Sequence, residues 1–259
     1  MFNFTVISSN IRFNNPADGV HSWDGRRVIL ANALNNYRPA VIGTQEGWEP
    51  QLRDFQELLD GLEIIDTNRE WIEDRMYPSL YYRPEIFELI NSGDIWLSET
   101  PYIAASKSFG SAFPRLCTWA ILKAKENGKH YFFVNAHLDH LESSTRQEQI
   151  KVLINEIEKV RADYPLILTG DFNESPFESV RKELNESNLN LTDPWIDLGH
   201  EECESHHSFK GFREDGSRID WILHSKDLLK CEQIHLHKES ANGIYPSDHF
   251  PVCATLSAK

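Results

Sequence analysis

Apolar runs that end in a polar side chain recur along this chain, and this repetition constrains its fold more than any other feature of the sequence. Residues 166–170 are mostly apolar and are followed by Asp171, while residues 40–46 end in Glu46. Short apolar runs bounded in this way are typical of buried strands. A single acid at a strand end is often only a turn residue. Its repetition instead predicts strands whose polar ends meet at one rim.

Segments with apolar residues at helical spacing alternate with these strands. Such spacing predicts helices over residues 30–37, 52–59, 144–160 and 177–186. Ser144 and Gln147 are expected to form a capping box at the start of the third helix.

The middle of the chain, residues 77–137, shows short strand patterns that indicate antiparallel pairing. Asn91-Ser92-Gly93 and Asn127-Gly128 are expected to be hairpin turns, because Asn and Gly can hold the positive φ angles of tight turns. Further strands are predicted over residues 217–224, 230–237 and 251–257. The order strand, helix, strand in both halves predicts an α/β fold of two packed sheets flanked by helices.

Length and composition fit one domain that spans residues 1–259. The chain is 40% hydrophobic, which is enough to bury a large core, and no linker or low-complexity tract interrupts it. Its longest polar stretch, residues 199–217, is expected to be an insertion loop within the domain.

The expected localisation is cytoplasmic. The N-terminus lacks a basic segment followed by a long apolar one, and no stretch approaches the roughly 18 apolar residues of a membrane helix. The cysteines, at positions 117, 203, 231 and 253, have neither the spacing nor the density of a disulfide scaffold, which suits a reducing compartment. Export after removal of a signal peptide is an alternative that stays open.

Net charge limits the choice of partner. A formal charge of -14 opposes an extended nucleic-acid footprint, because affinity for a phosphate backbone comes largely from Lys and Arg. An acidic protein can still act on phosphate when a divalent metal supplies the positive charge. Clustered carboxylates are then part of the site.

Candidate site residues gather at the predicted strand ends. They are Asn10, Glu46, His137, Asp171, Asn173, Asp220, Asp248 and His249. Oxygen ligands of this kind suit Mg²⁺ or Mn²⁺. A zinc site at Cys203, His206 and His207 is disfavoured, because adjacent histidines rarely share one tetrahedral ion. A polar loop bordering the site is expected there instead.

Two other segments leave alternatives open. The loop over residues 14–27 carries Trp23 and Arg26. Either both line the pocket, or Trp23 packs the loop against the protein and the arginine simply precedes a helix. Asp139 and His140 either support the site from behind or form a helix-entry turn.

Six short segments resemble, in order and spacing, the motif series of the endonuclease/exonuclease/phosphatase superfamily, which includes the DNase I-like nucleases. They read SSNIR, TQE, NAHLDH, TGDFNESP, RIDWI and SDHFPV. The segments NIRFNNPADGVHSWDGRR, SGDIWLSETP and FPRLCTWA are similar to a bacterial branch related to the deadenylase-like members. The fold that this resemblance implies is a four-layer α/β sandwich, with two mixed β-sheets packed together and flanked by helices.

The resemblance also implies roles on the metal side. Glu46 matches the carboxylate that binds the divalent cation, with Asn10 beside it and Asp248 as a further metal-side acid. Asp171 matches the acid that orients or activates the attacking water, and Asn173 matches the amide that hydrogen-bonds the phosphate.

Other implied roles concern the scissile phosphate. His249 matches the histidine opposite it, as a base or as a cation that stabilises the transition state, and Asp220 matches the acid paired with that histidine. His137 matches a donor to the phosphate. Arg115 takes the place of a tyrosine found in several members, and its guanidinium can clamp two phosphate oxygens. A surface salt bridge is the alternative for Arg115.

Together these features predict a phosphoester hydrolase that depends on Mg²⁺ or Mn²⁺. A phosphodiesterase or nuclease is favoured, with a phosphorylated small molecule or a short nucleic acid as its substrate. A phosphomonoesterase acting on a sugar or inositol phosphate is the first alternative. A non-catalytic binding protein on the same scaffold is the second, and it is disfavoured because Glu46, Asp220 and His249 are all present.

Overall fold

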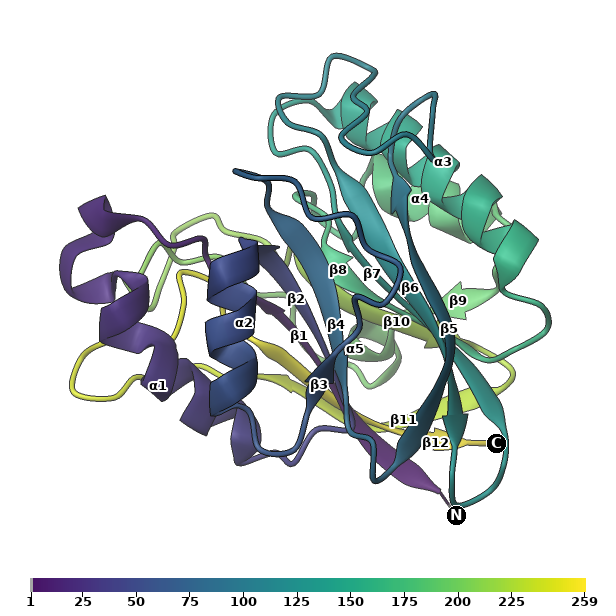
Figure 1. Cartoon of the computed structure of the whole chain (residues 1–259), viewed down its shortest axis with the longest axis horizontal. Coiled ribbons are helices and arrows are strands. Elements are labelled where there is room, and N and C mark those ends of the chain that lie inside the picture. Colours follow the sequence, from purple (N-terminus) through teal and green to yellow (C-terminus); the bar gives the residue numbers. More distant parts are fainter. Residues whose placement is uncertain (1) are drawn as a thin grey trace.

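Two six-stranded β-sheets lie face to face in the structure, a computed structural model that describes residues 2–259 (Figure 1). The first sheet has the strand order β11 (Leu229–Leu236), β12 (Val252–Ala258), β1 (Asn3–Asn10), β2 (Val41–Gly47), β4 (Tyr77–Tyr82) and β3 (Glu63–Ile64). The second has the order β5 (Phe87–Trp96), β6 (Leu116–Ala124), β7 (His130–His137), β8 (Leu166–Asp171), β10 (Asp220–Ser225) and β9 (Leu191–Thr192).

Helices cover the outer face of each sheet. The first sheet is covered by α1 (Trp23–Asn35) and α2 (Glu49–Leu58), and the second by α3 (Ser143–Val160) and α4 (Ser179–Glu186). Two shorter elements are the 3-10 helix η1 (Pro16–His21) and α5 (Pro194–Asp197). The four layers confirm the α/β sandwich predicted from the sequence.

Continuous apolar runs fit strands that are covered on both faces. Successive side chains of a strand point to opposite faces of the sheet. In β7, Phe133 packs between the sheets against Phe4 and Phe87, while Phe132 and Val134 join the apolar cluster beneath the helices of the second sheet. Both faces of this strand are therefore buried, which explains why its sequence is apolar at nearly every position.

Each sheet contains one parallel pair of strands, and these pairs decide where the polar strand ends lie. β1 runs parallel to β2, and β7 runs parallel to β8, whereas the other pairs are antiparallel. Asn10, Glu46, His137 and Asp171 stand at or next to the ends of these four strands. The antiparallel partners β10 and β12 begin at the same rim, where Asp220 and His249 lie.

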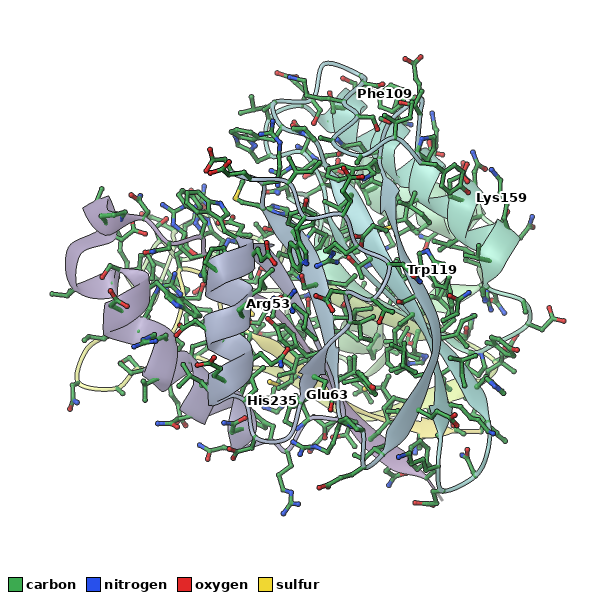
Figure 2. All side chains as sticks on the ribbon, viewed as in Figure 1. Arg53, Glu63, Phe109, Trp119, Lys159 and His235 are labelled. Carbon is green, nitrogen blue, oxygen red and sulfur yellow. The ribbon has the colours of Figure 1, made fainter. Side chains whose placement is uncertain are left out.

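The hairpin predicted at Asn91-Ser92-Gly93 is wrong. These residues lie inside β5, whose register against β6 shifts between Leu89 and Asn91. Gly93 is needed for packing, because a Cβ there would lie 3.1 Å from the ring of Trp119 (Figure 2). The register shift and the close packing of Gly93 against Trp119 explain why residue types that are typical of turns occur inside this strand. The turn predicted at Asn127-Gly128 is confirmed, with Gly128 at φ 71° between β6 and β7.

The capping box predicted for Ser144 and Gln147 is also wrong, because Ser144 already lies inside α3 and no side chain caps the first turn. The turn before the helix is held by Asp139 instead. Its Oδ1 accepts hydrogen bonds from the backbone N–H groups of Leu141 at 2.9 Å and Glu142 at 3.1 Å. The helix-entry alternative for Asp139 is therefore confirmed.

A buried polar cluster joins the two sheets below the rim. Asn135 donates to the carbonyl oxygens of Thr44 at 2.7 Å and Ser79 at 3.0 Å, and its Oδ1 accepts from Gln45 Nε2 at 2.7 Å. The two sheets can come this close because residue 43 is a glycine. A Cβ at this position would lie 2.7 Å from Asn135 Oδ1. These bonds fix β2 against β7 close to the ends of both strands.

None of the helices formed by residues 2–259 is long and apolar enough to cross a membrane. All four cysteines are free thiols, so no disulfide supports the described part of the chain.

Candidate active site

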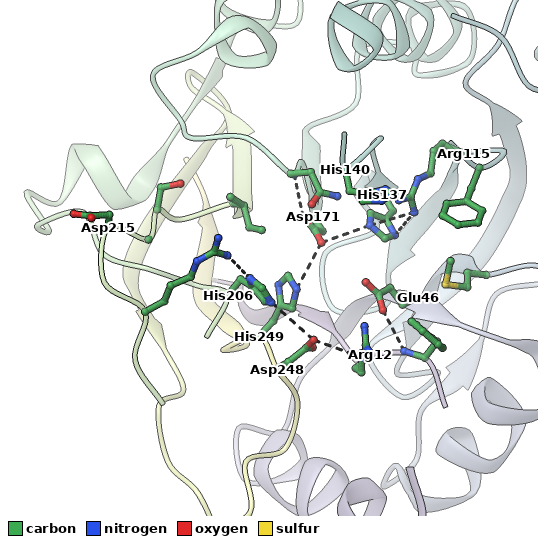
Figure 3. Close-up of a pocket in the computed structure, with 18 residues that line it drawn as sticks. Arg12, Glu46, Arg115, His137, His140, Asp171, His206, Asp215, Asp248 and His249 are labelled. Carbon is green, nitrogen blue, oxygen red and sulfur yellow. Dashed lines mark hydrogen bonds and ion pairs between the residues drawn. The ribbon is translucent and has the colours of Figure 1, made fainter. Parts of the chain in front are cut away.

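A cavity of about 490 Å³ opens at the rim where the parallel strands end (Figure 3). Most of the predicted site residues line it, namely Glu46, Arg115, His137, Asp171, Asn173, Asp248 and His249. The other two, Asn10 and Asp220, are fully buried behind these side chains and hydrogen-bond to them. The structure therefore brings all nine residues together, while their catalytic roles stay predictions.

Glu46 faces the cavity because β2 is irregular at its end. The register of β2 against β4 shifts between Thr44 and Gly47, and Glu46 has φ 69°, a conformation that few residues other than glycine adopt. A bulge of this kind redirects a side chain. The redirected carboxylate accepts hydrogen bonds from the backbone N–H of Phe13 at 3.2 Å and from Asn10 Nδ2 at 3.0 Å.

Asn10 bridges two carboxylates. Its Nδ2 donates to Asp171 Oδ2 at 2.9 Å as well as to Glu46, and its Oδ1 accepts the backbone N–H of Arg12 at 2.9 Å. Since a backbone N–H can only donate, this last bond fixes the orientation of the amide. Asn10 thus has its predicted place beside Glu46, with its nitrogen rather than its oxygen turned toward the carboxylates.

Asp171 lies between the other groups of the site. It stands in register with His137 on β7 and with Asp220 on β10. Burial and the neighbouring charge of Asp220 raise the pKa of Asp171 to about 7, which suits a group that takes up a proton near neutral pH. Its Oδ1 accepts the backbone N–H of Asn173 at 2.9 Å, while the side-chain amide of Asn173, predicted to bind phosphate, donates to the Leu138 carbonyl oxygen at 3.1 Å.

His249 and Asp220 form a buried pair. His249 Nδ1 lies 2.8 Å from Asp220 Oδ2, which also accepts the Ser205 hydroxyl at 2.6 Å. Burial alone would lower the pKa of His249, but the charges of Asp220, Asp171 and Asp248 raise it to about 10. The imidazole is therefore a cation at neutral pH, and its Nε2 faces Asp171 Oδ2 at 4.0 Å.

Arg115 contacts imidazoles in place of an acid. Its Nη1 lies 2.9 Å from His137 Nδ1, and its Nη2 lies 3.4 Å from His140 Nδ1. Burial and the charge of Arg115 hold the pKa of His137 well below its usual value, so that imidazole is neutral. No carboxylate within residues 2–259 forms an ion pair with Arg115, and its charge is available to an anion. The surface salt bridge proposed as an alternative is wrong, because Arg115 is only 6% exposed.

The loop before β10 adds two residues that the sequence reasoning did not assign to the site. The rings of His206 and His249 have centroids 4.6 Å apart, and His206 Nδ1 lies 2.7 Å from Arg213 Nη1. Burial lowers the pKa of His206 to about 4, so it is a neutral acceptor for the guanidinium. Both residues line the cavity. The only sequence signal was their position in the long polar stretch.

The disfavoured zinc reading is not supported within residues 2–259. No group of potential metal ligands there includes Cys203, and the ring of His207 stacks on Phe250 with centroids 3.9 Å apart. The polar loop borders the site, as expected.

Arg12 was also missed, although it follows Asn10 closely in the sequence. It lines the cavity, pairs with Asp18 at 3.1 Å and lies 3.8 Å from Asp248 Oδ2. Asp248 thus stands between Arg12 and His206, whose Nε2 is 3.9 Å away.

The loop over residues 14–27 supports the site from behind. Arg26 is fully buried and donates to the carbonyl oxygens of Ile11 at 2.5 Å, Arg12 at 2.7 Å and Pro246 at 3.2 Å. Trp23 is buried as well, and neither side chain lines the central cavity. The packing alternative is therefore confirmed for Trp23. Arg26 does more than precede a helix, because it lies inside α1 and ties the segment after β1 to the segment before Asp248.

The carboxylate side of the cavity fits a divalent cation. Potential ligand atoms of Glu46, His137 and Asp171 lie within 4.8 Å of one another. Glu46 forms no ion pair with a basic side chain within residues 2–259, and burial already disfavours the charge on Asp171. A hard cation would neutralise both acids. Glu46 is therefore the carboxylate that would hold it, close to Asp171 and with Asp248 on the same rim.

Comparisons with known proteins agree with this geometry. The chain matches the Endonuclease/Exonuclease/phosphatase family over residues 7–249. It is 26% identical to human nocturnin over 91% of its own length, and it spans 58% of the length of that protein.

Solved structures are similar over the whole chain. The endonuclease/exonuclease/phosphatase from Bacteroides vulgatus has a TM-score of 0.92 at 24% identity, with both chains covered completely. A mannosyl-6-phosphatase of Bacteroides thetaiotaomicron has a TM-score of 0.88 at 28% identity and covers 98% of this chain and 99% of its own. With the family match and the convergent acidic site, these similarities show that the chain belongs to the Endonuclease/Exonuclease/phosphatase family of phosphoester hydrolases.

Proposed function

We propose that the protein is a divalent-metal-dependent phosphomonoesterase that acts on a small organic phosphate. The charges of the cavity carry this proposal. Arg115, Arg213 and the His249 cation face one cavity, and neither guanidinium forms an ion pair with a carboxylate within residues 2–259. A phosphomonoester has three terminal oxygens and a charge of about -1.5 to -2 near neutral pH. A phosphodiester has a single charge and needs fewer cations.

Size and net charge support the same substrate class. A cavity of about 490 Å³ falls within the range of about 300–1,000 Å³ that is usual for small-molecule sites. The charge of -14 gives no general attraction for a nucleic-acid polymer. The similar mannosyl-6-phosphatase has a name that describes a monoesterase. The phosphodiesterase or nuclease favoured by the sequence therefore becomes the alternative.

Each residue has a defined chemical task in this proposal. Asp171 takes a proton from the attacking water, whose oxygen bonds to phosphorus as the bond from phosphorus to the leaving oxygen breaks, and the leaving oxygen takes a proton from solvent to become the alcohol. Arg115 and the His249 cation neutralise the phosphoryl oxygens in the transition state. When bound at Glu46, a divalent cation would add positive charge at the phosphate and acidify the water.

A substrate screen with Mg²⁺ and with Mn²⁺ tests the proposal. Phosphate release from hexose 6-phosphates and nucleoside 5′-monophosphates is compared with cleavage of bis-p-nitrophenyl phosphate and of a short oligonucleotide. We expect kcat/KM for the best monoester to exceed that for either diester by at least about tenfold. Glu46→Ala and His249→Ala serve as inactive controls. A higher kcat/KM for either diester would show that the protein is a phosphodiesterase or nuclease instead.

A further inference from the structure

A second cavity of about 300 Å³ adjoins the catalytic one. Phe13, Met76, Phe113 and Arg115 line both cavities, and the second is completed by Trp48, Asp74, Arg75 and Pro114. We propose that this second cavity holds the leaving group of the substrate and selects leaving groups that carry a ring, such as a nucleoside or a hexose. The inference rests on the proposed monoesterase function.

The second cavity lies beside the Arg115 side of the catalytic cavity, within reach of the organic part of a phosphate bound there. Figure 3 shows Glu46 and Arg115 on one side of Asp171, and His206 and His249 on the other. The second cavity continues from the Arg115 side, and Phe13 joins it to Glu46 through the bond from its backbone N–H. Attacking and leaving oxygens stand roughly in line through phosphorus. A phosphate clamped by Arg115, which lines both cavities, would therefore have its leaving group within reach of the second cavity.

The walls of the second cavity are held rigidly before a ligand binds. The Arg12 guanidinium covers one face of Phe13 at 4.3 Å from the ring centroid, and Trp48 stacks on Phe13 with centroids 6.0 Å apart and an angle of 17°. Phe113 stacks on His140 with centroids 5.8 Å apart, yet it remains 45% exposed. Fixed aromatic surfaces contact the flat face of a ring at little entropic cost, whereas an acyclic chain gains much less from them.

Two polar groups of the second cavity lack a partner in the described part of the chain, and one of them is Arg115 Nε. Arg75 Nε is buried and has no hydrogen-bond acceptor within residues 2–259. A buried N–H without an acceptor is unfavourable. A ring that carries hydroxyl or carbonyl oxygens would supply the acceptor, and both nucleosides and hexoses do so.

Kinetics with matched substrates test the selection. Phosphate release is measured for a nucleoside 5′-monophosphate, a hexose 6-phosphate and the acyclic glycerol 3-phosphate, with wild-type protein and the variants Trp48→Ala and Phe113→Ala. We expect each variant to lose at least about tenfold in kcat/KM for a ring-bearing substrate. For glycerol 3-phosphate we expect a change within about twofold. A larger loss of kcat/KM for the nucleoside 5′-monophosphate indicates that the cavity holds a base, and a larger loss for the hexose 6-phosphate indicates that it holds a sugar.

Phe177→Ala is the matched control, because Phe177 is also an exposed aromatic residue, at 70%, and lines neither cavity. Equal losses for ring-bearing and acyclic substrates, or no loss for either, would overturn the inference. Saturation-transfer NMR adds a readout independent of turnover. Ring protons of the ligand should receive saturation from the wild-type protein and much less from Phe113→Ala. If the NMR shows contact with the ring but no phosphate is released, the monoesterase proposal alone is wrong. If phosphate is released but the ring receives no saturation, only the present inference is wrong.

Discussion

His249 Nδ1 and Asp220 Oδ2 lie 2.8 Å apart in a setting where both side chains are buried. The same carboxylate oxygen accepts the Ser205 hydroxyl, so the acid is held in one orientation. Because Asp220 lies behind His249 rather than in the cavity, it sets the charge of the imidazole without competing for a substrate phosphate.

Replacing Asp220 by Asn should lower the pKa of His249, because the substitution removes the charge that raises it to about 10. The variant imidazole should therefore lose its proton at a lower pH than the wild-type imidazole. We expect kcat/KM at pH 8 to fall by about 100-fold or more and the alkaline limb of the pH profile to move to lower pH. Ser205→Ala, which keeps the carboxylate, should cost much less. Superimposable profiles for wild type and Asp220→Asn would contradict this role.

Chelation by EDTA should abolish activity, and added Mg²⁺ or Mn²⁺ should restore it. Glu46→Gln keeps the shape of the side chain and removes one of the charges that would hold the cation. Its affinity for Mn²⁺, measured by calorimetry, should fall by at least about tenfold. Glu49→Gln is the matched control, since Glu49 lies nearby on α2 but does not line the cavity. Equal Mn²⁺ affinity of the two variants would rule out Glu46 as a ligand.

Arg115→Lys should raise KM for a phosphomonoester by about 10-fold to 100-fold, because a lysine keeps the charge and loses the paired N–H donors. Arg53→Lys on the exposed surface of α2 (Figure 2) should leave KM unchanged. Steady-state kinetics check both variants. A Lys variant with wild-type KM would mean that Arg115 does not clamp the phosphate.

Arg26→Met should lower the free energy of unfolding by about 3 kcal/mol or more, because it leaves several buried carbonyl oxygens without donors. Arg27→Met, one residue along the same helix, should cost no more than about 1 kcal/mol, since Arg27 is partly exposed and its ion pairs are near the surface. Urea denaturation measures both. Equal costs would show that Arg26 does not hold the loop.

His207→Phe should weaken the acid sensitivity of the fold. Burial lowers the pKa of His207 to about 4, so between that pH and the ordinary value of about 6.5 the unfolded chain binds more protons than the folded protein. His207 therefore costs stability as pH falls through this window, by up to about 3 kcal/mol. Phe retains the stacking on Phe250 without the proton. Denaturation at pH 7 and pH 4.5 should show a smaller difference for the variant, and an unchanged difference would exclude His207 as the cause.

Much of the fold and site could be predicted from the sequence, because strand ends are local features. Asn10, Glu46 and Asp171 each follow an apolar run, and parallel pairing brings such ends together without reference to distant loops. The residue types at Asn91 and Gly93 misled the prediction, since a bulge and close packing against Trp119 call for the same residues as a turn.

Some contacts around the site could not be predicted, because no local pattern encodes them. Arg26 binds carbonyl groups of residues 11 and 246, and His206 meets His249 only after a long loop has folded over the rim. Periodicity and motif spacing cannot show such contacts. The contacts of Arg115 with His137 and of Arg213 with His206 could not be predicted either. They require neutral imidazoles, and only burial in the folded protein lowers the pKa values of these histidines.

The hydrogen bond from Ser247 Oγ to the Asn10 carbonyl oxygen, 2.6 Å long, joins residues from opposite ends of the sequence. The strand that follows Ser247, β12, pairs directly with β1. Asp248 and His249 therefore join the rest of the rim only when β12 has paired with the first strand of the same sheet.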